Sequence, residues 1–381
     1  MRPAKETGMH GIVLKCIKSI YGLTMAGNNW YRLFSETLIL CGLTQSNHDC
    51  CLFYSKLSGV LFLVLSHVDD VIMAGPTKLI QDLVNKLQEK FPTTGQRKIT
   101  HYCGMKIQDS DNRIFISCPS YIDSCIMRFG IQPSKPIPIP SKGRLTSREE
   151  HETKGDVPTM QAMTGALLWI SRVCRPDISF AVHELCKHTA NPSEQHILAA
   201  EQILCYLKGT STYGLSIKKK MPMDLSAYCD ADYNKTGERK PTSGMVVIMN
   251  GVPVQWTVKS QTQVATSTFE AELTSCFEAT REIVYWKALL EELRVLHTGP
   301  IEIKEDNRAV ISFATHGDNN EKLKHLPTKY HYVKQCVREG KVRLTSIPTE
   351  SNLSDILTKP LMVKEFVKFR ELLQVLDCLK E

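Results

Sequence analysis

The segment DLSAYCDADY, residues 224–233, opens the part of the sequence that decides the fold. Two more strand-like segments, SGMVVIMN at 243–250 and VPVQWTVK at 252–259, follow it with short connections. Such a run predicts a meander of antiparallel strands. A long helical pattern comes next at 268–296, and after it strands and helices alternate. Together these patterns predict a mixed α/β sheet flanked by helices.

The long helical pattern carries one acid on an otherwise apolar stripe. Positions spaced alternately by three and four residues fall on one side of a helix. Here they are Phe269, Glu272, Cys276, Ala279, Ile283, Trp286, Leu290 and Leu293. No cation shares this stripe, and an acid that faces a core needs a partner. Glu272 is therefore a candidate metal ligand, whereas Glu270 points roughly to the opposite side.

Three further acids lie where strand or helix ends could direct them toward one spot. Asp230 lies on the first strand, Asp306 ends the strand IEIKED, and Asp355 lies in the first turn of a helix. Hard divalent cations such as Mg²⁺ prefer oxygen ligands, and two such ions can assist hydrolysis of a phosphodiester. The alternative is that these acids are surface charges or helix caps, and spacing alone leaves it open.

The first half of the chain also interrupts a strand pattern with acids. LFLVLSHVDDVIMAG, residues 61–75, places Asp69 and Asp70 between two apolar runs. Buried acids are costly unless something pairs with them or binds them. CCLFYSK at 50–56 and VLFLVLSHVDDVIMAG at 60–75, joined by the turn LSG, predict a β-hairpin, and helical patterns at 28–43 and 77–91 flank it.

Several long motifs resemble one known family, in the family's own order. CDADY, RKPTSGMVVIMNGVPVQWTVKSQTQVATSTFEAEL, EDNRAV and SNLSDILTKPL closely resemble the ribonuclease H domain of copia-type LTR retrotransposon Pol polyproteins. SIYGLTMAGNNWY, the VDD segment, CPSYIDSCIMRFGI, SRVCRPDISFAV and CYLKGT resemble the reverse transcriptase of the same polyproteins. The resemblance covers roughly residues 11–365.

The resemblance implies a ribonuclease H fold with a two-metal site. The family's ligands fall on Asp230, Glu272, Asp306 and Asp355, which would hold two Mg²⁺ or Mn²⁺ ions. Asp232 is the weaker choice, because the family's ligand matches the first Asp of DAD. Basic residues would follow the phosphates of an RNA–DNA hybrid or another nucleic acid, unless they form a solvated face. They are Lys218, Lys219, Lys220, Lys324, His325, Lys329 and His331.

The same resemblance makes the VDD segment half of a second metal site. Asp69 and Asp70 match the palm acids that bind the metals for nucleotide addition. A polymerase also needs a third carboxylate from an earlier palm strand and a fingers region, and this chain starts too late to contain either. Asp49 matches a non-catalytic segment of the family. We therefore expect a vestigial palm site and no polymerase activity from this chain alone.

The predicted organisation has five segments within an α/β (α+β) fold. They are a palm/thumb remnant of a reverse transcriptase at 1–131, a linker rich in proline and charge at 132–160, a helical connection at 161–213, a ribonuclease H-like domain at 214–365 and a C-terminal helix at 366–381.

Composition narrows the setting. The net charge of +7 suits an anionic partner without requiring one. The 14 cysteines are scattered with no CxxC pair, which indicates free thiols in a reducing compartment. The N-terminal MRPAKETGMH lacks the apolar core of a signal peptide, and no apolar run approaches the ~20 residues of a membrane span. We expect an intracellular protein, in cytoplasm or nucleus, that is not secreted and has no membrane partner; its oligomeric state stays open.

Two functions remain at this point. The first is a Pol fragment that cuts RNA in RNA–DNA hybrids by two-metal hydrolysis. The second is a catalytically inert, nucleic-acid-binding transposon relic. The intact set of four acids argues against long decay, because one random loss would break the site.

Overall fold

The computed structural model describes residues 19–20, 22–57, 59–92, 98–132, 137–233, 240–295, 299–315 and 330–380. The chain forms two compact units, Met1–Ile99 and Thr100–Glu381. The boundary therefore lies earlier than the division at residues 131 and 132 that the sequence predicts. In the described part of the chain, no helix combines the length and the apolar composition that crossing a membrane requires.

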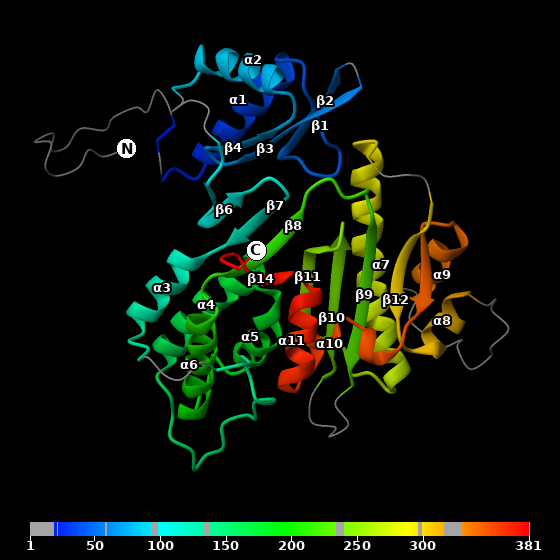
Figure 1. Ribbon diagram of the computed structural model, residues 1–381. Coiled ribbons are helices and arrows are strands. Elements are labelled where there is room, and N and C mark those ends of the chain that lie inside the picture. Colours follow the sequence, from blue (N-terminus) through cyan, green and yellow to red (C-terminus); the bar gives the residue numbers. More distant parts are fainter. Residues whose placement is uncertain are drawn as a thin grey trace, which may run out of the picture. The chain divides into compact units, whose positions relative to one another are not determined.

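The first unit is an antiparallel four-stranded sheet with helices packed on it (Figure 1). Its elements are α1 (Ala26–Leu40), β1 (Thr44–Gln45), β2 (Leu52–Leu57), β3 (Val60–His67), β4 (Asp70–Ala74) and α2 (Thr77–Gln88). Leu38, Phe53, Val64 and Leu87 from both helices and the sheet share one core. The hairpin predicted on either side of the turn LSG is confirmed as β2 and β3, and the VDD segment leads from β3 into β4, which pairs with it.

The second unit begins with a sheet built from distant parts of the sequence. Its strand order is β14-β8-β7-β6-β5. The strands are β5 (His101–Tyr102), β6 (Met105–Asp109), β7 (Arg113–Ser117), β8 (Tyr213–Lys218) and β14 (Val375–Asp377). Because β7 pairs with β8, the hairpin at 101–117 belongs to this unit and not to the preceding one. The predicted C-terminal helix ends early, since β14 pairs with β8 and buries Val375.

Helices fill the space beside this sheet. They are α3 (Pro119–Arg128), α4 (Val157–Val173), α5 (Ser179–Cys186) and α6 (Glu194–Gly209). The helical connection predicted at 161–213 corresponds to α4–α6. Residues 137–156 of the predicted linker contain no helix or strand beyond a single bridge between Lys154 and Ser193.

A buried ion pair holds these helices together. Arg175 follows α4 and binds both carboxylate oxygens of Asp177, at 2.9 and 2.8 Å. The same guanidinium donates to the carbonyl and hydroxyl oxygens of Thr210, at 2.9 and 2.8 Å, and the Tyr206 hydroxyl donates to Asp177 at 2.6 Å. Both charged side chains are fully buried. Such a pair is stable only because each polar atom finds a partner.

The second sheet has the order β11-β10-β9-β12-β13. It contains β9 (Leu225–Asp232), β10 (Thr242–Met249), β11 (Val252–Ser260), β12 (Ile301–Glu305) and β13 (Val342–Ser346). β9, β10 and β11 form an antiparallel meander, whereas β12 runs parallel to both β9 and β13. The mixed sheet that the sequence predicts for this region is confirmed.

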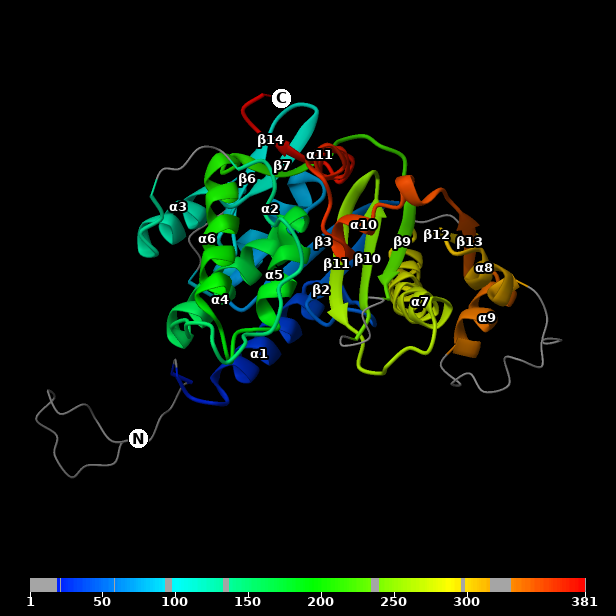
Figure 2. The same cartoon turned by 90° about the horizontal axis from the view of Figure 1, so that it is seen from below.

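Helices cover both faces of this sheet (Figure 2). α7 (Thr268–Glu292), α8 (Arg308–Thr315) and α9 (His331–Arg338) lie on one face, and α10 (Asp355–Thr358) and α5 lie on the other; α11 (Val363–Leu372) follows α10 and packs on β14. Met245 and Val247 join the core that contains α7, while Val246 and Ile248 join the core that contains α10. The continuous apolar run in β10 follows from this double burial.

Candidate metal centre

The candidate site lies where β9, α7 and β12 bring three acids together. Asp230 lies near the end of β9, Glu272 in the second turn of α7, and Asp306 directly after β12. One carboxylate oxygen from each lies within 4.8 Å of the other two. The sequence thus predicted correctly that these acids converge, including the acid on the apolar stripe of α7.

The fourth predicted acid joins this group through a lysine. Asp355 begins the short helix α10. Lys359 places its Nζ 2.9 Å from Asp355 Oδ1 and 3.5 Å from Asp230 Oδ1. Among the described residues, Lys359 is the one cation that forms an ion pair with any of the four acids. The sequence interpretation did not single it out, although its spacing of four residues from Asp355 is a known ion-pair signal.

Close packing of α10 on β10 places Asp355 and Lys359 here. Gly244 lies opposite Asp230 in the strand register. A Cβ at Gly244 would lie 2.6 Å from Thr358 Cγ2 and 2.9 Å from Leu357 Cβ, so only glycine permits this approach. Thr358 then donates its hydroxyl to Asp230 Oδ2.

Burial and mutual repulsion raise the pKa values of these acids. Burial first, and then the neighbouring carboxylates led by Asp230, raise the pKa of Glu272 to about 10, although the Ala231 N–H donates to its Oε2 at 2.7 Å. Burial and Asp230 raise the pKa of Asp355 to about 7 against the effect of Lys359. Burial also raises the pKa of Asp230. Crowded acids with raised pKa values are typical of functional sites.

Glu305 is a buried acid that the sequence interpretation missed. It precedes Asp306 and is fully buried. It accepts hydrogen bonds from the Asn307 N–H at 3.0 Å and from the thiol of Cys229 at 3.2 Å. Burial raises its pKa to about 8. The alternation of IEIKED could have signalled that Glu305 lies on the buried face of β12, on the same side as Ile301 and Ile303.

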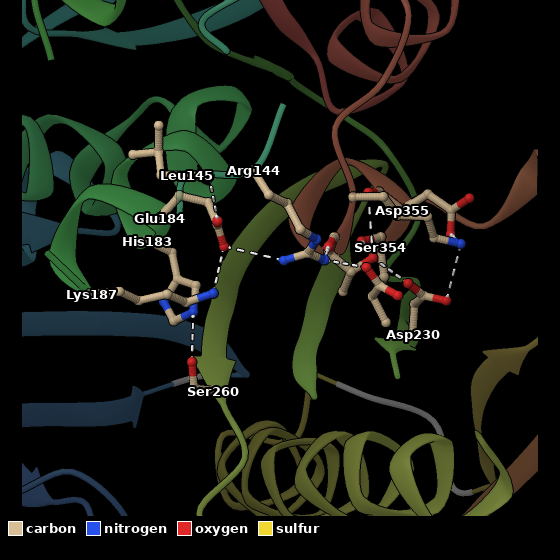
Figure 3. Close-up of polar contacts among 12 residues, drawn as sticks. Arg144, Leu145, His183, Glu184, Lys187, Asp230, Ser260, Ser354 and Asp355 are labelled. Carbon is tan, nitrogen blue, oxygen red and sulfur yellow. Dashed lines mark hydrogen bonds and ion pairs between the residues drawn. The ribbon is translucent and has the colours of Figure 1, made fainter. Parts of the chain in front are cut away.

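A second network connects this site with α5. Arg144 donates to Asp232, to the Thr358 carbonyl oxygen at 2.7 Å and to Glu184 at 3.2 Å. Figure 3 shows Arg144 between Glu184 of α5 and the end of the sheet that carries Asp230. Burial alone would raise the pKa of Glu184, but Lys187 and Arg144 lower it. Asp232 thus binds a cation of the protein, and among the described residues it lies outside the group formed by Asp230, Glu272 and Asp306.

The predicted palm acids lie in the first unit. Asp69 lies in the turn between β3 and β4, and Asp70 begins β4; both are exposed. Among the residues that the structure describes, neither belongs to a group of three or more possible metal ligands. Their role as a vestigial metal site stays a prediction.

The predicted phosphate contacts are scattered. Lys218 ends β8, in the other sheet, and Lys219 forms an ion pair with Asp109. Lys220 is exposed, as is His331 at the start of α9. Lys324, His325 and Lys329 lie outside the described residues. Lys219 is therefore engaged within the protein, and the contacts of these residues with nucleic acid stay predictions.

Comparison with known proteins finds similar sequences in a reverse transcriptase family and in transposon polyproteins. Residues 4–142 match the family model of the reverse transcriptase (RNA-dependent DNA polymerase). The Retrovirus-related Pol polyprotein from transposon RE1 of Arabidopsis thaliana is 29% identical over 361 residues, covering 94% of this chain and 24% of that protein. The Retrovirus-related Pol polyprotein from transposon TNT 1-94 of Nicotiana tabacum is 29% identical over 378 residues, covering 96% of this chain and 28% of that protein. The chain thus spans about a quarter of the length of these curated relatives.

The fold also has a counterpart among solved structures. The foamy viral protease-reverse transcriptase in complex with RNA/DNA hybrid aligns with 90% of this chain and 40% of that chain. The TM-score is 0.50 at 12% sequence identity, which bears on the fold alone. The resemblance to the Pol polyproteins of copia-type transposons that the motifs indicate is therefore confirmed along nearly the whole chain.

Proposed function

We propose that the region from β9 to α10 is a metal-dependent endoribonuclease that cleaves the RNA strand of RNA–DNA hybrids. The observation that carries this proposal is the convergence of Asp230, Glu272 and Asp306 within 4.8 Å of one another. Like charges at this separation destabilise one another, so their proximity makes sense if a cation binds them. Their position at one end of a ribonuclease H-like sheet supports a nuclease.

The donor set fits magnesium or manganese. Asp230, Glu272, Asp306 and Asp355 offer only oxygen ligands, which Mg²⁺ and Mn²⁺ prefer. Two such ions, when bound, supply positive charge that stabilises the attacking and leaving oxygens at a phosphodiester. We propose these four acids as their ligands.

The protein's own residues keep this donor set in place. The Thr358 hydroxyl orients Asp230, and the Ala231 N–H orients Glu272. Arg144 fixes the carbonyl of Thr358 and so restrains the end of α10. Catalytic ligands need such restraints, because small displacements of a reacting group are costly in rate.

Two observations support the proposed substrate: the net charge of the chain and its similarity in fold to a solved structure. A net charge of +7 favours a polyanion. One solved structure with a similar fold, the foamy viral protease-reverse transcriptase, is a complex with RNA/DNA hybrid. We propose that this chain binds the same class of nucleic acid, with phosphate contacts that depend on its basic residues.

A cleavage assay tests the proposal. The purified chain is incubated with an RNA–DNA hybrid labelled on the RNA strand, with Mg²⁺, with Mn²⁺ or with a chelator. We expect endonucleolytic cuts that need the cation and that Glu272→Gln reduces at least a hundredfold. The matched control is Glu270→Gln, because Glu270 binds Thr266 near the start of the same helix and should leave cleavage nearly unchanged. Hybrid binding without cation-dependent cleavage would favour the inert relic.

A further inference from the structure

Lys359 occupies an unusual place among the acids of the candidate site. Its Nζ lies 2.9 Å from Asp355 Oδ1 and 3.5 Å from Asp230 Oδ1. The side chain of Lys359 is 33% exposed, whereas those of Asp230 and Asp355 are 2% and 9% exposed. The ammonium group therefore reaches from the surface onto two largely buried carboxylates.

The backbone holds Lys359 in this position. Its N–H donates to the carbonyl of Asp355 at 3.1 Å and closes the last turn of α10. The preceding residue, Thr358, is bound on its side chain by Asp230 and on its carbonyl by Arg144. Pro360 follows and keeps Lys359 in extended backbone, at φ −132° and ψ 151°. The lysine thus approaches the site from an anchored segment.

The carboxylate oxygens that bind Lys359 belong to two of the proposed metal ligands. An oxygen engaged by an ammonium group is a weaker ligand for another cation, because the two positive charges repel each other at short range. The burial of Asp230 and Asp355 strengthens this effect, since solvent screens buried charges poorly. A divalent cation must therefore displace Lys359 or bind beside a positive charge.

We propose that Lys359 competes with divalent cations for Asp230 and Asp355, and thereby sets the cation concentration at which the site fills. The inference rests on the proposed function, because it takes Asp230 and Asp355 as cation ligands. At low cation concentration, Lys359 balances part of the negative charge of the acids. At high concentration, the ammonium group leaves these oxygens to the cation.

Cation binding without substrate tests this inference. The full chain is stripped with a chelator, dialysed and titrated with Mn²⁺ and with Mg²⁺ by calorimetry. Lys359→Met keeps much of the length and apolar stem of the side chain but removes the charge. We expect it to bind the cation about tenfold more tightly than the parent, the factor that corresponds to 1.4 kcal/mol. Lys359→Arg keeps the charge and should bind close to the parent value.

Unfolding measurements supply a second readout that does not depend on activity. With chelator present, Lys359→Met should unfold at a lower temperature than Lys359→Arg, because the acids lose their cationic partner. Lys359→Gln, a second neutral variant, serves if Lys359→Met does not fold. Lys341→Met removes an exposed lysine that pairs with Glu339, and it should change neither measurement.

The outcomes separate the two proposals. Equal or weaker cation binding in both neutral variants, with clear binding in the parent, would overturn the competition and leave the metal site standing. No cation binding in the parent or in any variant would overturn the proposed metal site and the competition together. Tighter binding in the neutral variants with no hybrid cleavage would support the competition and count against the nuclease.

Discussion

Replacing Glu272 with glutamine should have opposite effects on stability and on cation binding. Glu272 has a pKa of about 10 in the fold and an ordinary value of 4.5. At neutral pH the folded protein therefore keeps this carboxyl group protonated while the unfolded chain ionises it. Each pH unit above the ordinary value costs the fold about 1.4 kcal/mol. At pH 7 this amounts to at most about 3 kcal/mol, and partial exposure of the side chain reduces it to roughly 1–3 kcal/mol.

The sign of the effect depends on pH and on the cation. Because the pKa of Glu272 is raised in the fold, the stability that its protonated form contributes is fully present below about pH 4.5. This contribution is lost as pH rises through the folded pKa. With chelator present, Glu272→Gln should match the parent near pH 5 and be more stable by about 1–3 kcal/mol at pH 7–8. Saturating Mg²⁺ stabilises the parent, by about 2.7 kcal/mol at one hundred times the dissociation constant. Mg²⁺ should stabilise Glu272→Gln much less than it stabilises the parent. The difference in the free energy of unfolding between the two proteins should therefore shrink or change sign.

Urea denaturation followed by circular dichroism measures both effects, with or without Mg²⁺. Glu270→Gln, on the same helix, is the control and should follow the parent at each pH. If Glu272→Gln were less stable than the parent in chelator at pH 8, the contact of the Glu272 carboxylate with the Ala231 N–H would outweigh its burial and its repulsion by the other acids, and the raised pKa would be wrong.

Three other predictions concern the helices and the partner. Asp177→Asn should destabilise the fold by about 3–5 kcal/mol, because it leaves the buried Arg175 charge without its carboxylate. In urea denaturation, Arg175→Met combined with Asp177→Leu should recover much of this loss. A loss below about 1 kcal/mol in Asp177→Asn would contradict the prediction. Burial and then Lys187 lower the pKa of His183 to about 4. The free energy of unfolding should therefore fall as pH drops from about 6.5 toward 4, by at most about 1.4 kcal/mol per pH unit. His183→Gln should make the free energy of unfolding less dependent on pH in this range. Binding to an RNA–DNA hybrid, measured by fluorescence anisotropy, should weaken linearly with the logarithm of salt concentration, and an affinity independent of salt would rule out phosphate contacts.

The sequence predicted those parts of the site that local patterns encode. The helical stripe alone identified Glu272, because periodicity shows which side of a helix faces the core and an acid there is exceptional. The meander and the alternating elements after it likewise predicted the mixed sheet. These features depend on residues close together in the chain.

Contacts between distant segments were not predictable in the same way. Arg144 and Asp232 are 88 residues apart, and nothing in either local pattern indicates their pairing. The short strand β14 forms because β8 offers an unpaired edge, so its own sequence, which also suits a helix end, does not reveal it. The boundary between the compact units shifted for the same reason, since the pairing of β7 with β8 outweighs their separation along the chain.

The candidate site therefore depends on more than the sheet that carries most of its acids. Asp230 is oriented by Thr358, and α10 reaches Asp230 only because Gly244 leaves room for it. The carbonyl of Thr358 is in turn bound by Arg144, from a loop that precedes α4. Glu184 of α5 also binds Arg144. The loop and α5 therefore restrain the end of α10, and Lys359 is the next residue after that helix. The geometry that places a cationic side chain against two of the acids is thus a property of the whole second unit, which explains why the motifs of the sheet alone did not reveal it.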